Sequence, residues 1–179
     1  MSGNPTASRP WRRITPFVRD MVYGANDGIV TTFAIVASVI GAGLETRVIL
    51  IVGFASLFAD GTSMAASDYL AERTEQARQG EDGQWRESLG SALATFFAFL
   101  VAGSLPLIPY ILFPDAPNVF WWAAGATALA LVLVGSARTL VTTRAGWRGA
   151  LEMLLIGGVA VVVAYWIGRY VSSLTGGGI

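Results

Sequence analysis

The sequence predicts an all-α integral membrane protein, a bundle of five transmembrane helices. Hydrophobic residues make up 54% of the 179 residues and charged residues only 13%, with a mean hydropathy of +0.57. A soluble domain usually carries roughly 25% charged residues. Five apolar stretches follow one another along the chain, each close to the ~20 residues that a helix needs to cross a bilayer. Because lipid cannot hydrogen-bond an open backbone, we expect all five to be helices.

The polar segments between these stretches predict the element boundaries. The spans are expected at about 21–44, 48–71, 88–113, 119–137 and 150–171, within a transmembrane domain of residues 21–172. The remaining segments are a cytoplasmic N-terminal tail (1–20), a short charged cytoplasmic linker (73–87) and a C-terminal tail (173–179). The charged linker is also able to extend the second helix into water. In the third span, Pro106 and Pro109 predict a bend or a partly re-entrant segment.

Arginine supplies all twelve cations of the chain, and its distribution predicts an orientation. If the N-terminus is cytoplasmic, only Arg47 and Arg169 fall outside, which follows the positive-inside rule. The six tryptophans lie near the predicted span ends, as aromatic belts do. We therefore expect a cytoplasmic N-terminus and an external C-terminus. Because the chain is small and shows no organelle signal, a bacterial plasma membrane is the expected location.

The composition excludes several kinds of site. The chain has no histidine and no cysteine, so it lacks the commonest zinc and copper ligand, the commonest general base and any disulfide. Its net charge of zero gives no indication of a nucleic-acid partner. No serine has an evident base and no cofactor ligands are apparent, so we expect neither an enzyme nor a resident cofactor. Any metal must be bound by oxygen atoms or by a thioether.

The second span carries the most informative polar pattern. Asp60, Met64 and Asp68 are spaced four residues apart and therefore stack on one helical face, beside Ser63 and Ser67. Asp60 has the deepest position. An ionised carboxylate in the bilayer centre costs at least ~2.5 kcal/mol and usually marks an ion path. Oxygen ligands with a thioether favour Fe²⁺ or Mn²⁺ over Mg²⁺ or Ca²⁺. The alternative is a small-residue packing face in which the methionine is only a filler.

The first span offers a further acid, Asp27, about one or two turns inside its start. It shares a helical face with Tyr23, Asn26 and Thr31. We predict that Asp27 borders the ion path, although a helix-start residue in a wet interface is an alternative. Gly24 and Gly28 have the G-x-x-x-G spacing that permits close approach of another helix.

Two acids near the predicted cytoplasmic edge have alternative partners. Glu152 in the fifth span lies four residues after Arg148, so an ion pair is as reasonable as a metal site. Asp68 is similarly placed to pair with Arg73. Both acids are kept as candidate ligands.

Four motifs occur in order along the chain: GANDGIVTTF at 24–33, ADGTSMAASDYL at 59–70, PLIPY at 106–110 and LEMLLIGG at 151–158. Together they resemble the signatures of the vacuolar iron transporter (VIT) family, which includes the nodulin-21-like proteins. The resemblance covers nearly the whole chain from Tyr23 to Gly168.

This resemblance implies a five-helix homodimer with the ion path near the dimer interface. It also implies export of Fe²⁺ or Mn²⁺ from the cytosol, in exchange for protons. The family's first-helix aspartate matches Asp27 and its second-helix methionine matches Met64, which implies that these two bind the metal. From spacing alone we add Asp60, Asp68 and Glu152 as further ligands or proton carriers. Exchange requires a carboxylate for which metal and proton compete.

The chain departs from the family pattern between the second and third helices. The resemblance leads us to expect a large helical insert there, rich in Glu and Met, that collects cytosolic metal. Residues 72–87 are too few to form it and contain no methionine. Acids in this segment are able to attract cations, but a solvated, salt-bridged helix end is the favoured interpretation.

A function of another class also fits part of the pattern. A non-transporting membrane interaction module, or scaffold, assembled through small-residue faces would account for the many glycines and alanines. It would not account for the stacking of Asp60, Met64 and Asp68 on one face.

Overall fold

The computed structural model describes residues 15–80, 84–137 and 146–176. Its elements are α1 (Thr15–Gly41), α2 (Thr46–Gln79), α3 (Trp85–Ser104), the 3₁₀ turn η2 (Leu105–Leu107), α4 (Ile108–Leu112), α5 (Val119–Ala137) and α6 (Gly146–Leu174). These elements form five helical segments that are long and apolar enough to cross a membrane. The predicted fold class is confirmed, and the chain is a multi-pass membrane protein.

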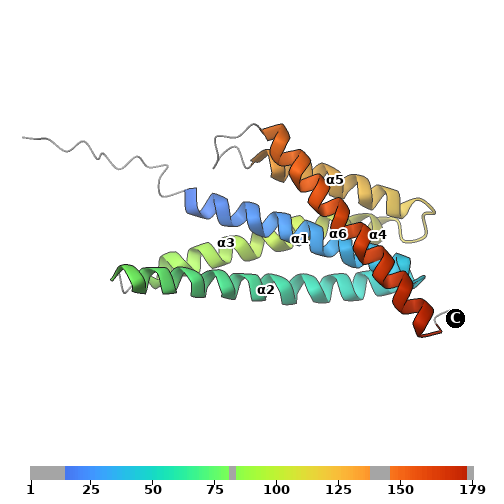
Figure 1. Ribbon diagram of the computed structural model, residues 1–179, viewed down its shortest axis with the longest axis horizontal. Helices are drawn as coiled ribbons and strands as arrows, with labels where there is room; N and C mark the ends of the chain where they lie inside the picture. Colours follow the sequence, from blue (N-terminus) through green and yellow to red (C-terminus); the bar gives the residue numbers. More distant parts are fainter. Residues whose placement is uncertain (1–14, 81–83, 138–145, 177–179) are drawn as a thin grey trace, which may run out of the picture.

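Helix α1 is the centre of the bundle, because it packs against α2, α3, α5 and α6. Helices α2 and α3 pack against each other on one side of α1, and α6 crosses α1 obliquely on its way past α5 (Figure 1). Helix α6 packs mainly on α1 and α5. The bundle therefore has two parts that meet at α1, the pair α2–α3 and the pair α5–α6.

The contact between α1 and α3 is close because glycines lie in it. A Cβ atom at Gly24 would lie 2.7 Å from the Thr95 carbonyl oxygen, and one at Gly28 would lie 2.5 Å from the Phe99 carbonyl oxygen. From the other side, a Cβ atom at Gly103 would lie 2.9 Å from the Gly28 carbonyl oxygen. The close approach predicted from the spacing of Gly24 and Gly28 is therefore confirmed, and α3 is the partner.

The α-helix of the third span is interrupted at its prolines. Helix α3 ends at Ser104, Pro106 lies in the 3₁₀ turn, and Pro109 lies in the first turn of α4. The apolar segment nevertheless continues from Trp85 to Leu112. The third span is thus long and apolar enough for a full crossing, with a 3₁₀ turn at its first proline.

Helices α1, α2 and α6 extend beyond the apolar stretches that predicted them. Helix α1 begins at Thr15, so residues 15–20 belong to a helix rather than to the predicted tail. Helix α2 continues to Gln79 and ends at Gly80, whose φ of 73° is left-handed, so it includes the first part of the predicted linker. Helix α6 extends beyond both predicted ends. Polar terminal turns can stay helical outside the hydrocarbon, where hydropathy no longer marks them.

The exposed end of α2 is a salt-bridged helix, as favoured from the sequence. The Arg78 guanidinium donates to both carboxylate oxygens of Glu75 at 2.9 and 2.7 Å. The Gln79 amide also donates to Glu75, and the Arg73 guanidinium donates to the Gln76 side-chain oxygen at 3.4 Å. Glu81 and Asp82 lie outside the described residues.

Tryptophans gather at the ends of the described helices. Trp85 opens α3, Trp121 and Trp122 lie in the first turn of α5, Trp147 opens α6, and Trp166 lies toward the end of α6. All five side chains are exposed. This is the placement that an aromatic belt requires. Trp11 lies outside the described residues.

Candidate metal path

An open pocket of about 440 Å³ lies between α1, α2 and α3, in the N-terminal half of α1. Its lining comprises Arg19, Asp20, Tyr23, Met64, Ser67, Asp68, Ala71 and Thr95. The pocket thus combines two carboxylates, three hydroxyl groups, a thioether and one guanidinium. Two predicted metal ligands, Met64 and Asp68, share it.

The position of Asp68 is fixed from α3. The Thr95 hydroxyl, on a side chain only 2% exposed, donates to the Asp68 Oδ2 atom at 2.8 Å. The alternative partner, Arg73, donates instead to Gln76. The second carboxylate oxygen of Asp68 remains available to a cation in the pocket.

Asp20 is a second carboxylate of this pocket, and the sequence interpretation missed it by assigning residue 20 to the tail. Its side chain is only 7% exposed. The Ser91 hydroxyl of α3 donates to its Oδ2 atom, and the Arg19 Nε atom donates to its Oδ1 atom at 3.0 Å. The four-residue spacing of Asp20, Gly24 and Gly28 is the signal that would have placed it on the face of α1 that packs against α3.

A deeper level of the bundle holds Asp27 and Asp60. The two carboxylates are close enough to interact electrostatically, and the Ser56 hydroxyl donates to the Asp60 Oδ2 atom. Because α1 begins at Thr15, Asp27 lies near the middle of the span Phe17–Gly41, deeper than predicted. Their electrostatic interaction places Asp27 and Asp60 at one level of the bundle.

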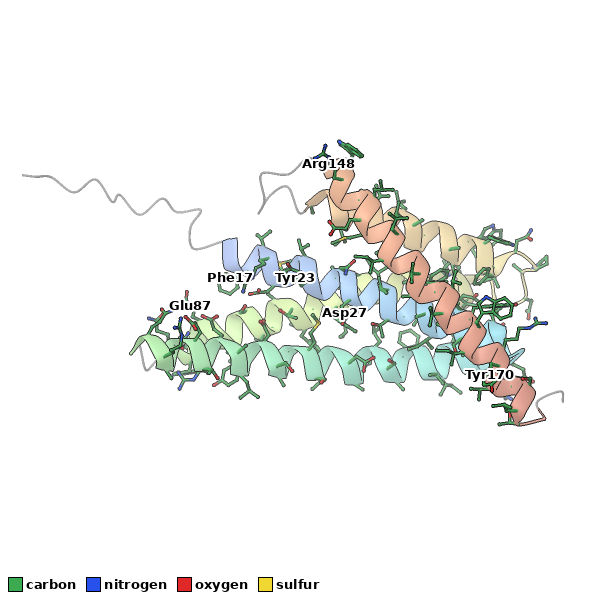
Figure 2. The ribbon with its side chains drawn as sticks, in the orientation of Figure 1. Phe17, Tyr23, Asp27, Glu87, Arg148 and Tyr170 are labelled. Carbon is green, nitrogen blue, oxygen red and sulfur yellow. The ribbon has the colours of Figure 1, made fainter. Side chains whose placement is uncertain are left out.

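Met64 lies on α2 between the two levels. One residue of helix rises 1.5 Å, so the four-residue spacing separates Asp68, Met64 and Asp60 by about 6 Å each along the axis. All three side chains are partly buried. Tyr23 and Asp27 lie one turn apart on α1 (Figure 2), and Tyr23 lines the pocket. These residues form a polar path from the pocket into the middle of the span.

Asn26, predicted to share a face with Tyr23 and Asp27, is partly buried. Its Oδ1 atom is buried and has no hydrogen-bond partner within the described residues. A buried amide oxygen of this kind usually has a partner. Asn26 directly precedes Asp27 in the sequence.

Glu152 lies outside the pocket between α1, α2 and α3. It is exposed on α6, and it does not line the pocket that holds Met64 and Asp68. Arg148, one turn before it, lies at the end of α6 that is farthest from α2 (Figure 2). In the part of the chain that the structure describes, no group of three or more acids is placed to hold a metal. The path offers pairs of carboxylates with Met64 between them, and a role for Glu152 stays a prediction.

Comparison with known proteins identifies the family. The model of the VIT family matches residues 18–82 and 77–169. The chain belongs to the VIT family. The two matched stretches of this VIT-family chain meet at the end of α2, where it lacks the insert that the resemblance led us to expect.

Curated relatives agree with the assignment. Vacuolar iron transporter 1 of Eucalyptus grandis is 24% identical, over 87% of this chain and 87% of its own length. Vacuolar iron transporter homolog 1 of Oryza sativa subsp. japonica is 30% identical, over 84% of this chain and 72% of its own. The vacuolar iron transporter of Toxoplasma gondii is 43% identical over 60 residues. This VIT-family chain is therefore a membrane transporter of metal ions, a class of protein distinct from enzymes.

Proposed function

We propose that this chain moves Fe²⁺ or Mn²⁺ out of the cytosol in exchange for protons, along the path defined by Asp68, Met64, Asp60 and Asp27. One observation carries the proposal. Two levels of carboxylates lie along α1 and α2, and a thioether stands between them. Carboxylate oxygens bind hard divalent ions and the thioether adds a softer contact, a combination that suits Fe²⁺ and Mn²⁺.

The carboxylate pairs provide a chemical basis for exchange. Asp27 and Asp60 repel each other when both are ionised, and the surrounding hydrocarbon disfavours both charges. A divalent cation relieves the repulsion, and so does a proton. Metal and proton therefore compete for the same carboxylates, which is the condition for antiport. The names of the relatives support iron as a substrate.

We further propose that two copies assemble with their α1 and α2 helices facing each other. Asp27 is exposed on the surface of a single copy, near the middle of a membrane span. An ionised carboxylate facing lipid at that depth costs at least ~2.5 kcal/mol, and a second copy would cover it. Phe54 and Phe58 on α2 are also exposed and would extend such an interface. A twofold dimer is the commonest oligomer.

The pocket supports the orientation expected from the arginines. Arg19, Arg73, Arg78 and Arg86 all lie near the end of the bundle where the pocket opens. With that end in the cytosol, as the positive-inside rule requires, metal enters through the pocket. A bacterial plasma membrane remains the proposed location.

Flux through purified protein in proteoliposomes tests the proposal. We expect uptake of Fe²⁺ and Mn²⁺, but little Ca²⁺, and a response to an imposed pH gradient. Substitution Met64→Leu keeps the shape of the side chain but removes the thioether. Because even outer-shell partners of a metal contribute about 10–100-fold to affinity or activity, we expect at least a 10-fold loss of Fe²⁺ flux.

Met21→Leu is the matched control, since Met21 is exposed on α1 and does not line the pocket. Equal Fe²⁺ flux in the two variants would remove Met64 from the path. Flux that ignores the pH gradient would contradict antiport while keeping the path. No flux of any metal and no metal-dependent thermal shift, from folded protein, would instead favour the scaffold function.

A further inference from the structure

Arg19 places a positive charge at the pocket through which metal is proposed to enter. Its Nε atom donates to Asp20 at 3.0 Å, and its side chain is 59% exposed whereas that of Asp20 is 7% exposed. The carboxylates of Asp68 and Glu72 are also close enough to interact with the guanidinium electrostatically. The guanidinium thus stands where carboxylates from α1 and α2 converge.

The side chains of Arg19 and Asp20 differ in how firmly their hydrogen bonds fix them. Asp20 is anchored on both oxygens, by the Ser91 hydroxyl on one and by Arg19 on the other. Among the described residues, Arg19 donates to Asp20 through Nε, and its side chain is 59% exposed. The carboxylate is therefore fixed in the pocket wall, whereas the arginine side chain is largely exposed to solvent.

We infer that Arg19 is a tethered cation that neutralises the carboxylates of the pocket between transport events and that an incoming divalent metal ion must displace. Arg19 is then a specificity-determining residue rather than a ligand. It lowers the affinity of the pocket for every cation by direct competition. The inference rests on the proposed function, in which metal enters by this pocket.

The charge of the competitor explains how selectivity would arise. At a given distance a divalent ion is attracted to a carboxylate twice as strongly as a monovalent ion. A divalent ion bound by Asp20 and Asp68, which both line the pocket, would release the arginine to water, and the exposure of the arginine keeps the cost low. Sodium and potassium ions, with the same charge as the guanidinium and no tether, are poor competitors. The pocket would thus stay closed to the abundant monovalent ions.

Mn²⁺ binding to the purified protein in detergent, measured by calorimetry, tests the inference. Arg19→Gln removes the competing charge, and we expect about 3- to 10-fold tighter Mn²⁺ binding, as for a partly screened repulsion near a protein surface. The same variant should become sensitive to inhibition by Na⁺. Arg19→Lys keeps the charge and should bind Mn²⁺ as the wild type does.

Arg47→Gln is the matched control, because Arg47 pairs with the exposed Glu45 at 3.1 Å at the opposite end of the bundle. If the wild-type protein binds Mn²⁺ and Arg19→Gln binds it equally or more weakly, the inference is wrong. The proposed function would not be affected by that result. Absence of Mn²⁺ binding to the wild-type protein would overturn both.

A second measurement uses the wild-type protein, so it does not depend on the folding of a variant. Phenylglyoxal modifies accessible guanidinium groups, and peptide mass spectrometry resolves the modified arginines. Saturating Mn²⁺ should increase labelling of Arg19 in the wild-type protein, because displacement frees its guanidinium, and should leave Arg47 unchanged. Equal or reduced labelling of Arg19 would show that the arginine stays on Asp20 when metal binds, which contradicts displacement.

Discussion

Asp27→Asn is expected to abolish Fe²⁺ and Mn²⁺ flux in proteoliposomes while the protein remains folded and assembled. The substitution preserves the size of the side chain but removes the charge that binds metal and the group that carries a proton. Asp60 alone would then face the metal in the middle of the span. Loss of an outer-shell partner usually costs about 10–100-fold, so loss of a ligand should cost at least that much.

Asp115→Asn is the matched control for this variant. Asp115 is exposed in the connection between α4 and α5, and it does not line the pocket between α1, α2 and α3. Thermal unfolding in detergent should be similar for both variants and the wild type. Normal flux through Asp27→Asn would exclude this residue as a ligand and as the shared site of exchange.

Gly28→Ala is expected to destabilise the bundle by about 1–3 kcal/mol, the usual cost of forcing an extra carbon into a packed core. The new Cβ atom would lie 2.5 Å from the Phe99 carbonyl oxygen and 3.2 Å from its Cα atom. Both are backbone atoms of α3, so no side-chain rotation relieves the contact. The two helices must separate, which also disturbs the hydrogen bond between Asp20 and Ser91. A clear decrease of the unfolding temperature in detergent is the expected measurement.

Gly125→Ala provides the comparison. Gly125 lies within α5, and a Cβ atom there would have no neighbour within 4 Å. Replacing a helical glycine by alanine removes a propensity cost of up to about 1 kcal/mol, so its unfolding temperature should be unchanged or higher. If Gly28→Ala unfolded at the same temperature as Gly125→Ala, the close contact between α1 and α3 would be wrong.

Much of the architecture was predictable because a membrane restricts the possibilities. Hydropathy located all five spans, and the fourth was predicted at 119–137, the bounds of α5. The prolines of the third span marked the place where its α-helix gives way to a 3₁₀ turn, and Gly24 and Gly28 predicted a close helix contact. Helix ends were less predictable, since polar turns remain helical at the membrane surface. The sequence Thr15-Pro16 carries a helix-start signal that would have moved the beginning of α1.

The site was predictable along single helices but not between them. The spacing of Asp60, Met64 and Asp68 showed that they share a face of α2, because that follows from helical periodicity alone. The hydrogen bonds from Thr95 to Asp68 and from Ser91 to Asp20 join residues 27 and 71 positions apart. No periodicity reports which helices are neighbours. For the same reason, the sequence did not show that Glu152 lies outside the pocket that holds Met64 and Asp68.

The position of bound Mn²⁺, located by its anomalous X-ray scattering, tests the proposed path most directly. We predict a peak in the pocket between Met64 and Asp68, or at the level of Asp27 and Asp60, and loss of the deeper peak in Asp27→Asn. A peak confined to Glu152 on α6 or to the charged end of α2 would contradict the path, because the metal would then have neither Met64 nor Asp27 as a ligand.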